Sequence, residues 1–112
     1  LTGQSQTDAF KSVEAEKLFN EAIVLFEKKT AQSYSAAELK FQKVAELSAK
    51  VGDRQQHAVA LVFVGRTLNE LGNNLKALEK YRQALTLFRI LKNKSWEATT
   101  LSNIGFVYKD LN

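Results

Sequence analysis

Two glycines that lie forty residues apart, Gly65 and Gly105, constrain the fold of this chain more than any other feature of its sequence. When the two segments are laid over each other, apolar residues on both sides of the glycines fall on one another. The matching pairs are Ala58 with Ala98, Leu61 with Leu101, and Leu71 with Leu111. A fixed spacing of this size predicts a protein built from repeated units. We therefore expect a surface that holds another chain rather than a catalytic centre.

The composition predicts a single all-helical domain. The 112 residues include no proline and are rich in Leu, Ala, Glu, Lys and Gln, which favour helices. No stretch shows the alternation of Val, Ile and Thr that extended strands would need. The longest apolar run, residues 58–64, has seven residues, too few for a membrane-spanning helix. We expect a soluble protein without membrane insertion.

Two residue types are missing from the sequence. The absence of cysteine excludes disulfides and thiolate metal sites, and we expect no cofactor. Methionine is also absent, even at position 1, and Asn112 falls where a further turn should begin. We therefore expect a fragment of a longer protein. A cytoplasmic location is favoured, and export after removal of a signal peptide stays open.

The helical spacing of apolar residues predicts five helices, over residues 7–29, 35–51, 54–71, 75–91 and 96–111. Between the first two lies a polar stretch, residues 30–34, which we expect to be a loop with Tyr34 as a local plug. Ser35 and Glu38 have the spacing of a capping box, in which each side chain hydrogen-bonds the backbone of the other residue.

Glycines and polar caps separate the later helices. Gly52 and Gly72 are expected to end the second and third helices, because glycine reaches the left-handed conformation without steric penalty. Asp53 and Asn74 are expected to cap the helices that follow. Connections this short join antiparallel neighbours, so the helices should form hairpins that stack. The small residues expected to let helix axes approach closely are Ala22, Gly65, Ala77, Ala84 and Gly105.

These residues together resemble the tetratricopeptide repeat (TPR) family. One complete repeat reads Leu61, Gly65, Leu68, Gly72, Ala77, Tyr81 and Ala84, and a half repeat reads Leu101, Gly105, Tyr108 and Leu111. A degenerate repeat precedes them with Leu18, Ala22, Leu25, Ala37, Phe41 and Val44. The resemblance implies an α-solenoid of stacked hairpins, with the degenerate repeat at about 13–51, the full repeat at about 54–91 and the half repeat at 96–112.

The chain departs from the usual family pattern. Its period of forty residues, rather than 34, resembles the kinesin-light-chain-like subclass that is common in bacterial signalling proteins. Ala22 and Ala37 are 15 residues apart, whereas Gly65 and Ala77 are 12 apart, so we expect three extra residues in the first loop. The array also ends on an unpaired helix.

The resemblance implies that a protein or peptide partner binds in a concave groove lined by the first helix of each repeat. Helical spacing then gives the expected groove residues, which are Phe19, Asn20, Ile23, Phe26, Val62, Phe63, Arg66, Asn69, Ser102, Asn103, Phe106 and Lys109. Many of these are apolar, and contiguous exposed apolar area marks an interaction site. We expect an apolar peptide or an amphipathic helix as the ligand. The alternative is that these side chains only pack between neighbouring helices.

Polar groove residues have roles that the resemblance implies. Asn103 and Asn20 occupy positions where relatives often hydrogen-bond the ligand backbone. Arg66 and Lys109 could pair with ligand carboxylates, or instead form surface salt bridges with acidic neighbours on their own helices, Glu70 and Asp110.

The sequence leaves two other functions open besides groove binding. Residues 76–94 hold six basic side chains, which could attract nucleic acid, although a solvated helix face explains them too. The last helix presents apolar residues that self-association or a further repeat would cover. The sequence holds no constellation for an enzyme, because its only histidine, His57, has no ligating neighbours. Trp96 is expected to be a packing lid.

Overall fold

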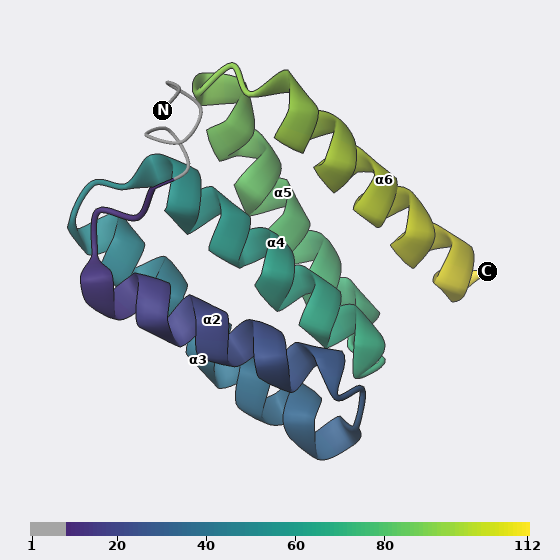
Figure 1. Ribbon diagram of the computed structural model, residues 1–112. Helices are drawn as coiled ribbons and strands as arrows, with labels where there is room; N and C mark the ends of the chain where they lie inside the picture. The colour runs from purple at the N-terminus through teal and green to yellow at the C-terminus, as the bar shows by residue number, and fades with distance from the viewer. Residues whose placement is uncertain (1–8) are drawn as a thin grey trace.

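The computed structural model describes residues 9–112, and these residues form five α-helices and no strand. The helices are α2 (Val13–Glu27), α3 (Ala31–Lys50), α4 (Arg54–Glu70), α5 (Asn74–Ile90) and α6 (Lys94–Leu111). Consecutive helices pack against each other and run antiparallel, with α2 and α3 at one end and α6 at the other (Figure 1). The predicted all-α class is confirmed, and the packing is consistent with a helical repeat.

Each pair of helices is joined by a three-residue turn whose middle residue has a positive φ. These residues are Lys29 (57°), Gly52 (73°), Gly72 (83°) and Lys92 (57°). The predicted helix ends at Gly52 and Gly72 are therefore confirmed. At the other two turns a lysine adopts the same left-handed conformation, in which its Cβ approaches the following carbonyl oxygen. Three of these residues, at 52, 72 and 92, recur every twenty positions.

The start of α3 differs from the prediction. Thr30 caps the helix by accepting a hydrogen bond from the Ser33 amide (3.0 Å), and the Ser33 hydroxyl accepts one from the Thr30 amide (3.0 Å). This reciprocal pair begins the helix at Ala31, so the predicted loop at 30–34 and the predicted capping box of Ser35 and Glu38 are wrong. The three extra residues therefore lengthen α3 rather than a loop.

Tyr34 consequently lies in the first turns of α3 and not in a loop. It is buried, and its ring packs edge-on against the ring of Phe26 with centroids 5.4 Å apart. The ring thus joins α2 to α3 near the turn that connects them.

Three other helix starts also differ from the prediction. The α2 helix begins at Val13, where the Ser12 hydroxyl accepts from the Ala15 amide (3.0 Å), and the predicted residues 7 and 8 lie outside the described part. Asn73, rather than Asn74, is the residue before α5. The α6 helix starts at Lys94, two residues before the predicted start, because the Asn93 side chain accepts from the backbone of the helix's third residue.

The core lies along α4, which packs between α3 and α5. The largest fully buried side chains include Phe41 and Val44 of α3, Val64 of α4, and Tyr81 and Phe88 of α5. Because α4 is covered by both neighbours, most of its residues are buried. The α4 helix is thus the element that positions the others.

Gly65 and Gly105 differ in their surroundings although they match in sequence. A Cβ on Gly65 would lie 2.6 Å from Cε1 of Tyr81, so only glycine admits this ring beside α4. A Cβ on Gly105 would have no atom within 4 Å among the described residues. The close approach of helices is therefore confirmed at Gly65, and the same expectation is wrong at Gly105 within residues 9–112.

These surroundings predict opposite effects of the same substitution. Gly105→Ala should raise the free energy of unfolding by about 0.5–1 kcal/mol, because alanine favours a helix interior over glycine. Gly65→Ala should lower it by about 1–3 kcal/mol, because the buried ring of Tyr81 must move. Urea denaturation of both variants measures the two changes. Equal effects at the two positions would contradict the packing.

The turns supply a second matched pair. The Asn73 amide donates to the Leu68 carbonyl (2.8 Å), and the Asn93 amide donates to the Phe88 carbonyl (2.9 Å), so the two turns are alike. Gly72→Ala should lower the free energy of unfolding by about 1 kcal/mol. Lys92→Gly should raise it by about 0.5 kcal/mol, since relief of the left-handed strain exceeds the added chain entropy. Thermal unfolding monitored by circular dichroism tests both signs, and destabilisation by Lys92→Gly would refute this description of the turn.

Candidate functional site

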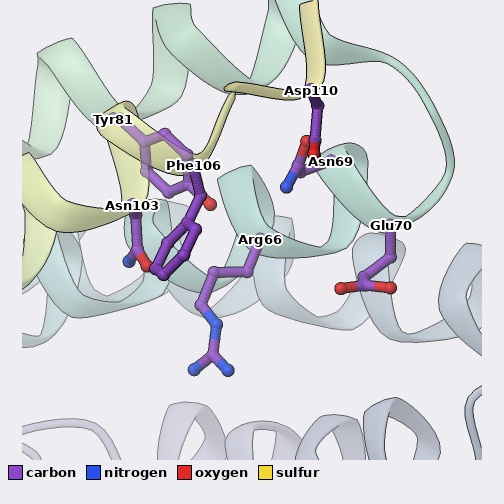
Figure 2. Close-up of a pocket in the computed structure, with 7 residues that line it drawn as sticks. All are labelled: Arg66, Asn69, Glu70, Tyr81, Asn103, Phe106 and Asp110. Carbon is purple, nitrogen blue, oxygen red and sulfur yellow. The ribbon is translucent and has the colours of Figure 1, made fainter. Parts of the chain in front are cut away.

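A cavity of about 310 Å³ lies between α4, α5 and α6 (Figure 2). It is lined by Arg66, Asn69 and Glu70 of α4, Tyr81 of α5, and Asn103, Phe106 and Asp110 of α6. Residues three and four apart on a helix lie on one face, so α4 and α6 each present a stripe of side chains to the cavity. The ring of Tyr81 that packs beside Gly65 also lines this cavity, so one side chain joins the core to the candidate site.

Two residues that line the cavity each carry a buried polar atom with no hydrogen-bond partner within residues 9–112. The two atoms are Oδ1 of Asn69 and Nδ2 of Asn103. Leaving a buried donor or acceptor unsatisfied costs about 1–3 kcal/mol, and such groups call for a physical explanation. Oδ1 of Asn69 is a hydrogen-bond acceptor and Nδ2 of Asn103 is a donor. The pair is therefore complementary to the N–H and C=O groups of a peptide backbone.

The charges around the cavity are mixed. Arg66 lies between two rings, with its Cζ 5.2 Å from the centroids of both Phe26 and Phe63. Its guanidinium points away from Asn69 and Asp110 (Figure 2), and it forms no salt bridge within residues 9–112. Lys109 likewise has no salt bridge there, so the alternative of pairing with acidic neighbours on the same helix is not found.

Tyr81 is uncharged at neutral pH. Burial raises the pKa of its hydroxyl, and the carboxylate of Glu70 adds to this rise, while Arg66 opposes it. The ring therefore presents a neutral phenol to the cavity, between groups of opposite charge.

The predicted groove residues of α2 lie outside this cavity, and the two phenylalanines among them, Phe19 and Phe26, belong to an aromatic cluster. Phe19 packs edge-on against Phe63 (5.3 Å between centroids) and against Phe41 (5.7 Å), and Phe41 stacks on Phe63 (5.1 Å). Phe26 adds to the cluster from two turns further along α2. Phe19, Phe26 and Phe63 are half-buried, so these rings pack between helices while keeping one edge at the surface.

The remaining predicted residues divide by exposure. Val62 is 1% exposed and belongs to the core, so the expectation that it lines a groove is wrong. Its position on the covered α4 helix explains the error. Asn20, Ser102 and Lys109 are exposed and Ile23 is half-buried, but none of these four residues lines the cavity.

The cavity thus gathers four of the twelve predicted residues, namely Arg66, Asn69, Asn103 and Phe106. Glu70 and Asp110, which helical spacing also places on the groove faces of their helices, line it as well. The sequence reasoning missed Tyr81 as a site residue. The signal that could have found it is the close approach expected at Gly65, which requires a neighbouring side chain to fill the space.

His57 and Trp96 have surroundings that suit packing. His57 lies in the first turns of α4 and is half-buried, and this burial lowers the pKa of its imidazole. Within residues 9–112 no three His, Asp or Glu side chains are grouped so that they could hold a metal ion. Trp96 stacks on Phe88 with centroids 5.5 Å apart, which confirms its expected packing role.

Half of the six basic side chains in residues 76–94 have partners on α6. Arg89 and Lys94 pair with Glu97 at 3.1 and 3.6 Å, and Arg82 donates a hydrogen bond to the Tyr108 hydroxyl (2.7 Å). Glu97 therefore offsets part of the basic charge at the α5–α6 end of this segment. Within the described residues, no helix combines the length and the apolar character that crossing a membrane requires.

Comparison with models of known protein families gives no match for this chain. A search of curated proteins gives no similar protein either.

The lowered pKa of His57 predicts a pH dependence of stability. The native state binds a proton at His57 less readily than the unfolded chain, whose histidine pKa is about 6.5, so protonation favours unfolding. The free energy of unfolding should therefore fall as the pH falls from 7 to 5. The carboxyl pKa values of Glu21 and Glu97 are lowered from an ordinary value of 4.5. These two carboxylates therefore change the free energy of unfolding mainly at pH values below 5.

His57→Gln is the matched control for this prediction, since glutamine does not titrate. Urea denaturation at pH 7 and pH 5 should show a smaller loss of stability in the variant than in the unaltered protein. The same loss in both proteins would mean that His57 is not responsible.

Proposed function

We propose that this chain is a segment of a TPR-like solenoid and that its function is to bind a peptide segment of a partner protein. The residue pattern around Gly65 and Gly105, the five consecutively packed antiparallel helices and the evenly spaced turns support the proposed class. In a solenoid of this kind α2, α4 and α6 would line the concave side. The cavity between α4 and α6 would then be the part of the groove that contacts the ligand most closely.

The observation that carries the proposal is the pair of unpartnered amide atoms in one cavity. A peptide group of the ligand can donate its N–H to Oδ1 of Asn69 and accept a hydrogen bond at its C=O from Nδ2 of Asn103. Neither atom has a hydrogen-bond partner within residues 9–112, so both stay available to a ligand backbone once the two side chains turn toward it. This interaction recognises the backbone, and any residue other than proline can supply it.

Side chains around the amides would set the preference among peptides. Phe106 is 59% exposed and offers an apolar contact. Arg66 can hold a carboxylate in bidentate geometry, with its guanidinium kept in place by the rings of Phe26 and Phe63. On the other side of the cavity, the carboxylate of Asp110 favours a hydrogen-bond donor on the ligand. We therefore propose an extended ligand with an acidic group near α2 and an apolar side chain beside Phe106.

The proposed role is binding without catalysis or a cofactor. Covalent catalysis of the kind served by an activated serine or cysteine needs a nucleophile beside an oriented base. The residues that line the cavity include no serine, cysteine or histidine. Their chemistry is that of hydrogen bonding, ion pairing and apolar contact.

Selection of random peptides displayed on phage, with this chain as the bait, tests the proposal. The affinity of the selected peptides should fall about tenfold with Asn103→Ala, because one hydrogen bond of about 1.5 kcal/mol is lost. Phe106→Ala should weaken binding similarly through the loss of apolar contact. Isothermal titration calorimetry gives the affinities, and circular dichroism checks that each variant is folded.

Asn20→Ala is the matched control, because Asn20 is an exposed asparagine of α2 that does not line the cavity. Its affinity for the same peptides should equal that of the unaltered protein. Peptides whose binding depends on Asn20 and not on Asn103 would place the ligand elsewhere. A selection that yields no binding peptide would count against the proposed function.

A further inference from the structure

We infer that one face of α6 is a docking surface for a second helix, and that this helix carries the same inner-face pattern as α5. We define the open face of α6 by Ala98, Leu101, Gly105 and Tyr108. This face is distinct from the cavity, and the inference does not depend on the proposed peptide binding.

The internal match between α6 and α4 carries the inference. The four residues of the open face correspond, forty positions earlier, to Ala58, Leu61, Gly65 and Leu68. In α4 these positions are buried, with Leu61 at 6% and Leu68 at 4% exposure, whereas Leu101 and Tyr108 are both 46% exposed. The difference arises because α5 packs against α4, and nothing in the described residues takes the equivalent place beside α6.

The rest of α6 shows that the open face is additional to its packing face. Thr100 and Val107 are fully buried where α6 packs against α5. The apolar residues of the open face are therefore not needed to hold α6 in place. An apolar face of this kind, with a glycine at its centre, fits a helix that approaches closely.

The contact between α4 and α5 specifies the occupant. On α5 the ring of Tyr81 stands beside Gly65, and the small residues Ala77 and Ala84 flank it one turn away on either side. A helix on the open face needs the same pattern of side chains. A small residue is followed four positions later by an aromatic residue, and three positions after that by another small residue. It would run antiparallel to α6, with its ring beside Gly105.

A second copy of the chain fits the open face less well. In a pair of α6 helices, the ring available to fill the space beside Gly105 would be Tyr108 of the other copy. The hydroxyl of Tyr108 is already held by Arg82 of its own chain (2.7 Å). An α5-like helix brings an aromatic ring that has no such restraint.

The test adds a peptide with the sequence of residues 73–91 to the intact chain. A lactam between Glu79 and a lysine introduced by Gln83→Lys holds the peptide helical, and both positions are exposed on α5, so the bridge stays off the inner face. The peptide is titrated into the intact chain, and the amide chemical shifts of the chain are recorded by nuclear magnetic resonance. Binding should shift the amide signals of Leu101, Gly105 and Tyr108. The same peptide with Tyr81→Ala should bind at least tenfold more weakly.

Gly105→Leu is the decisive variant of the chain. Because a Cβ at this position would contact none of residues 9–112 outside its own helix turn, the variant should unfold at a temperature no lower than the unaltered protein. Its side chain should nevertheless weaken binding of the peptide at least tenfold, since it fills the space that the ring requires.

Three outcomes would overturn the inference. The first is the absence of shift changes at about 1 mM peptide, a concentration that corresponds to about −4 kcal/mol of binding free energy. The second is equal affinity for Gly105→Leu and the unaltered chain. The third is sedimentation equilibrium showing that the chain alone forms a dimer that Gly105→Leu dissociates, because the occupant would then be a second copy.

Discussion

The contact between Gly65 and the ring of Tyr81 is the interaction on which the rest of this structure depends. The ring occupies the space that a Cβ on residue 65 would need, and this fixes how closely α5 approaches α4. Since α4 also packs against α3, this contact helps to set the position of α5 relative to the core. The same ring lines the cavity between α4 and α6, so the packing of the core determines the shape of the candidate site.

Two helices with matching sequences have different surroundings in this chain. Leu61 and Leu101 correspond in sequence, but α5 covers the first and leaves the second at the surface. Burial here depends on the neighbouring helix and not on the sequence of the helix itself. This difference explains why a glycine in the interior of α6 has no contact within the described residues, although glycine lowers the stability of a helix.

Much of the fold could be predicted from local signals in the sequence. Gly52 and Gly72 marked two turns because only glycine adopts the left-handed conformation without strain. The same reasoning could not find the turns at Lys29 and Lys92, where a lysine adopts that conformation. The start of α3 was misplaced because Ser35 and Glu38 have the spacing of a capping box, while the pair that caps the helix, Thr30 and Ser33, has a less familiar pattern.

The candidate site was less accessible to sequence reasoning. Helical spacing placed Asn69 and Asn103 on facing stripes, and the structure brings them into one cavity. The same spacing also selected Val62, which is buried because α4 has a neighbour on more than one side. No sequence pattern reveals that one amide atom of each asparagine is buried without a partner among residues 9–112, since that property depends on how α4, α5 and α6 pack together.

The most direct measurement is a set of nuclear Overhauser effects between glycine α-protons and aromatic ring protons in the intact chain. We expect strong effects between Gly65 and Tyr81, because the ring carbons lie within contact distance of residue 65. We expect none between Gly105 and any aromatic ring of the same chain other than its neighbour Phe106. A missing effect at Gly65, or an effect between Gly105 and the ring of a different helix, would contradict this packing.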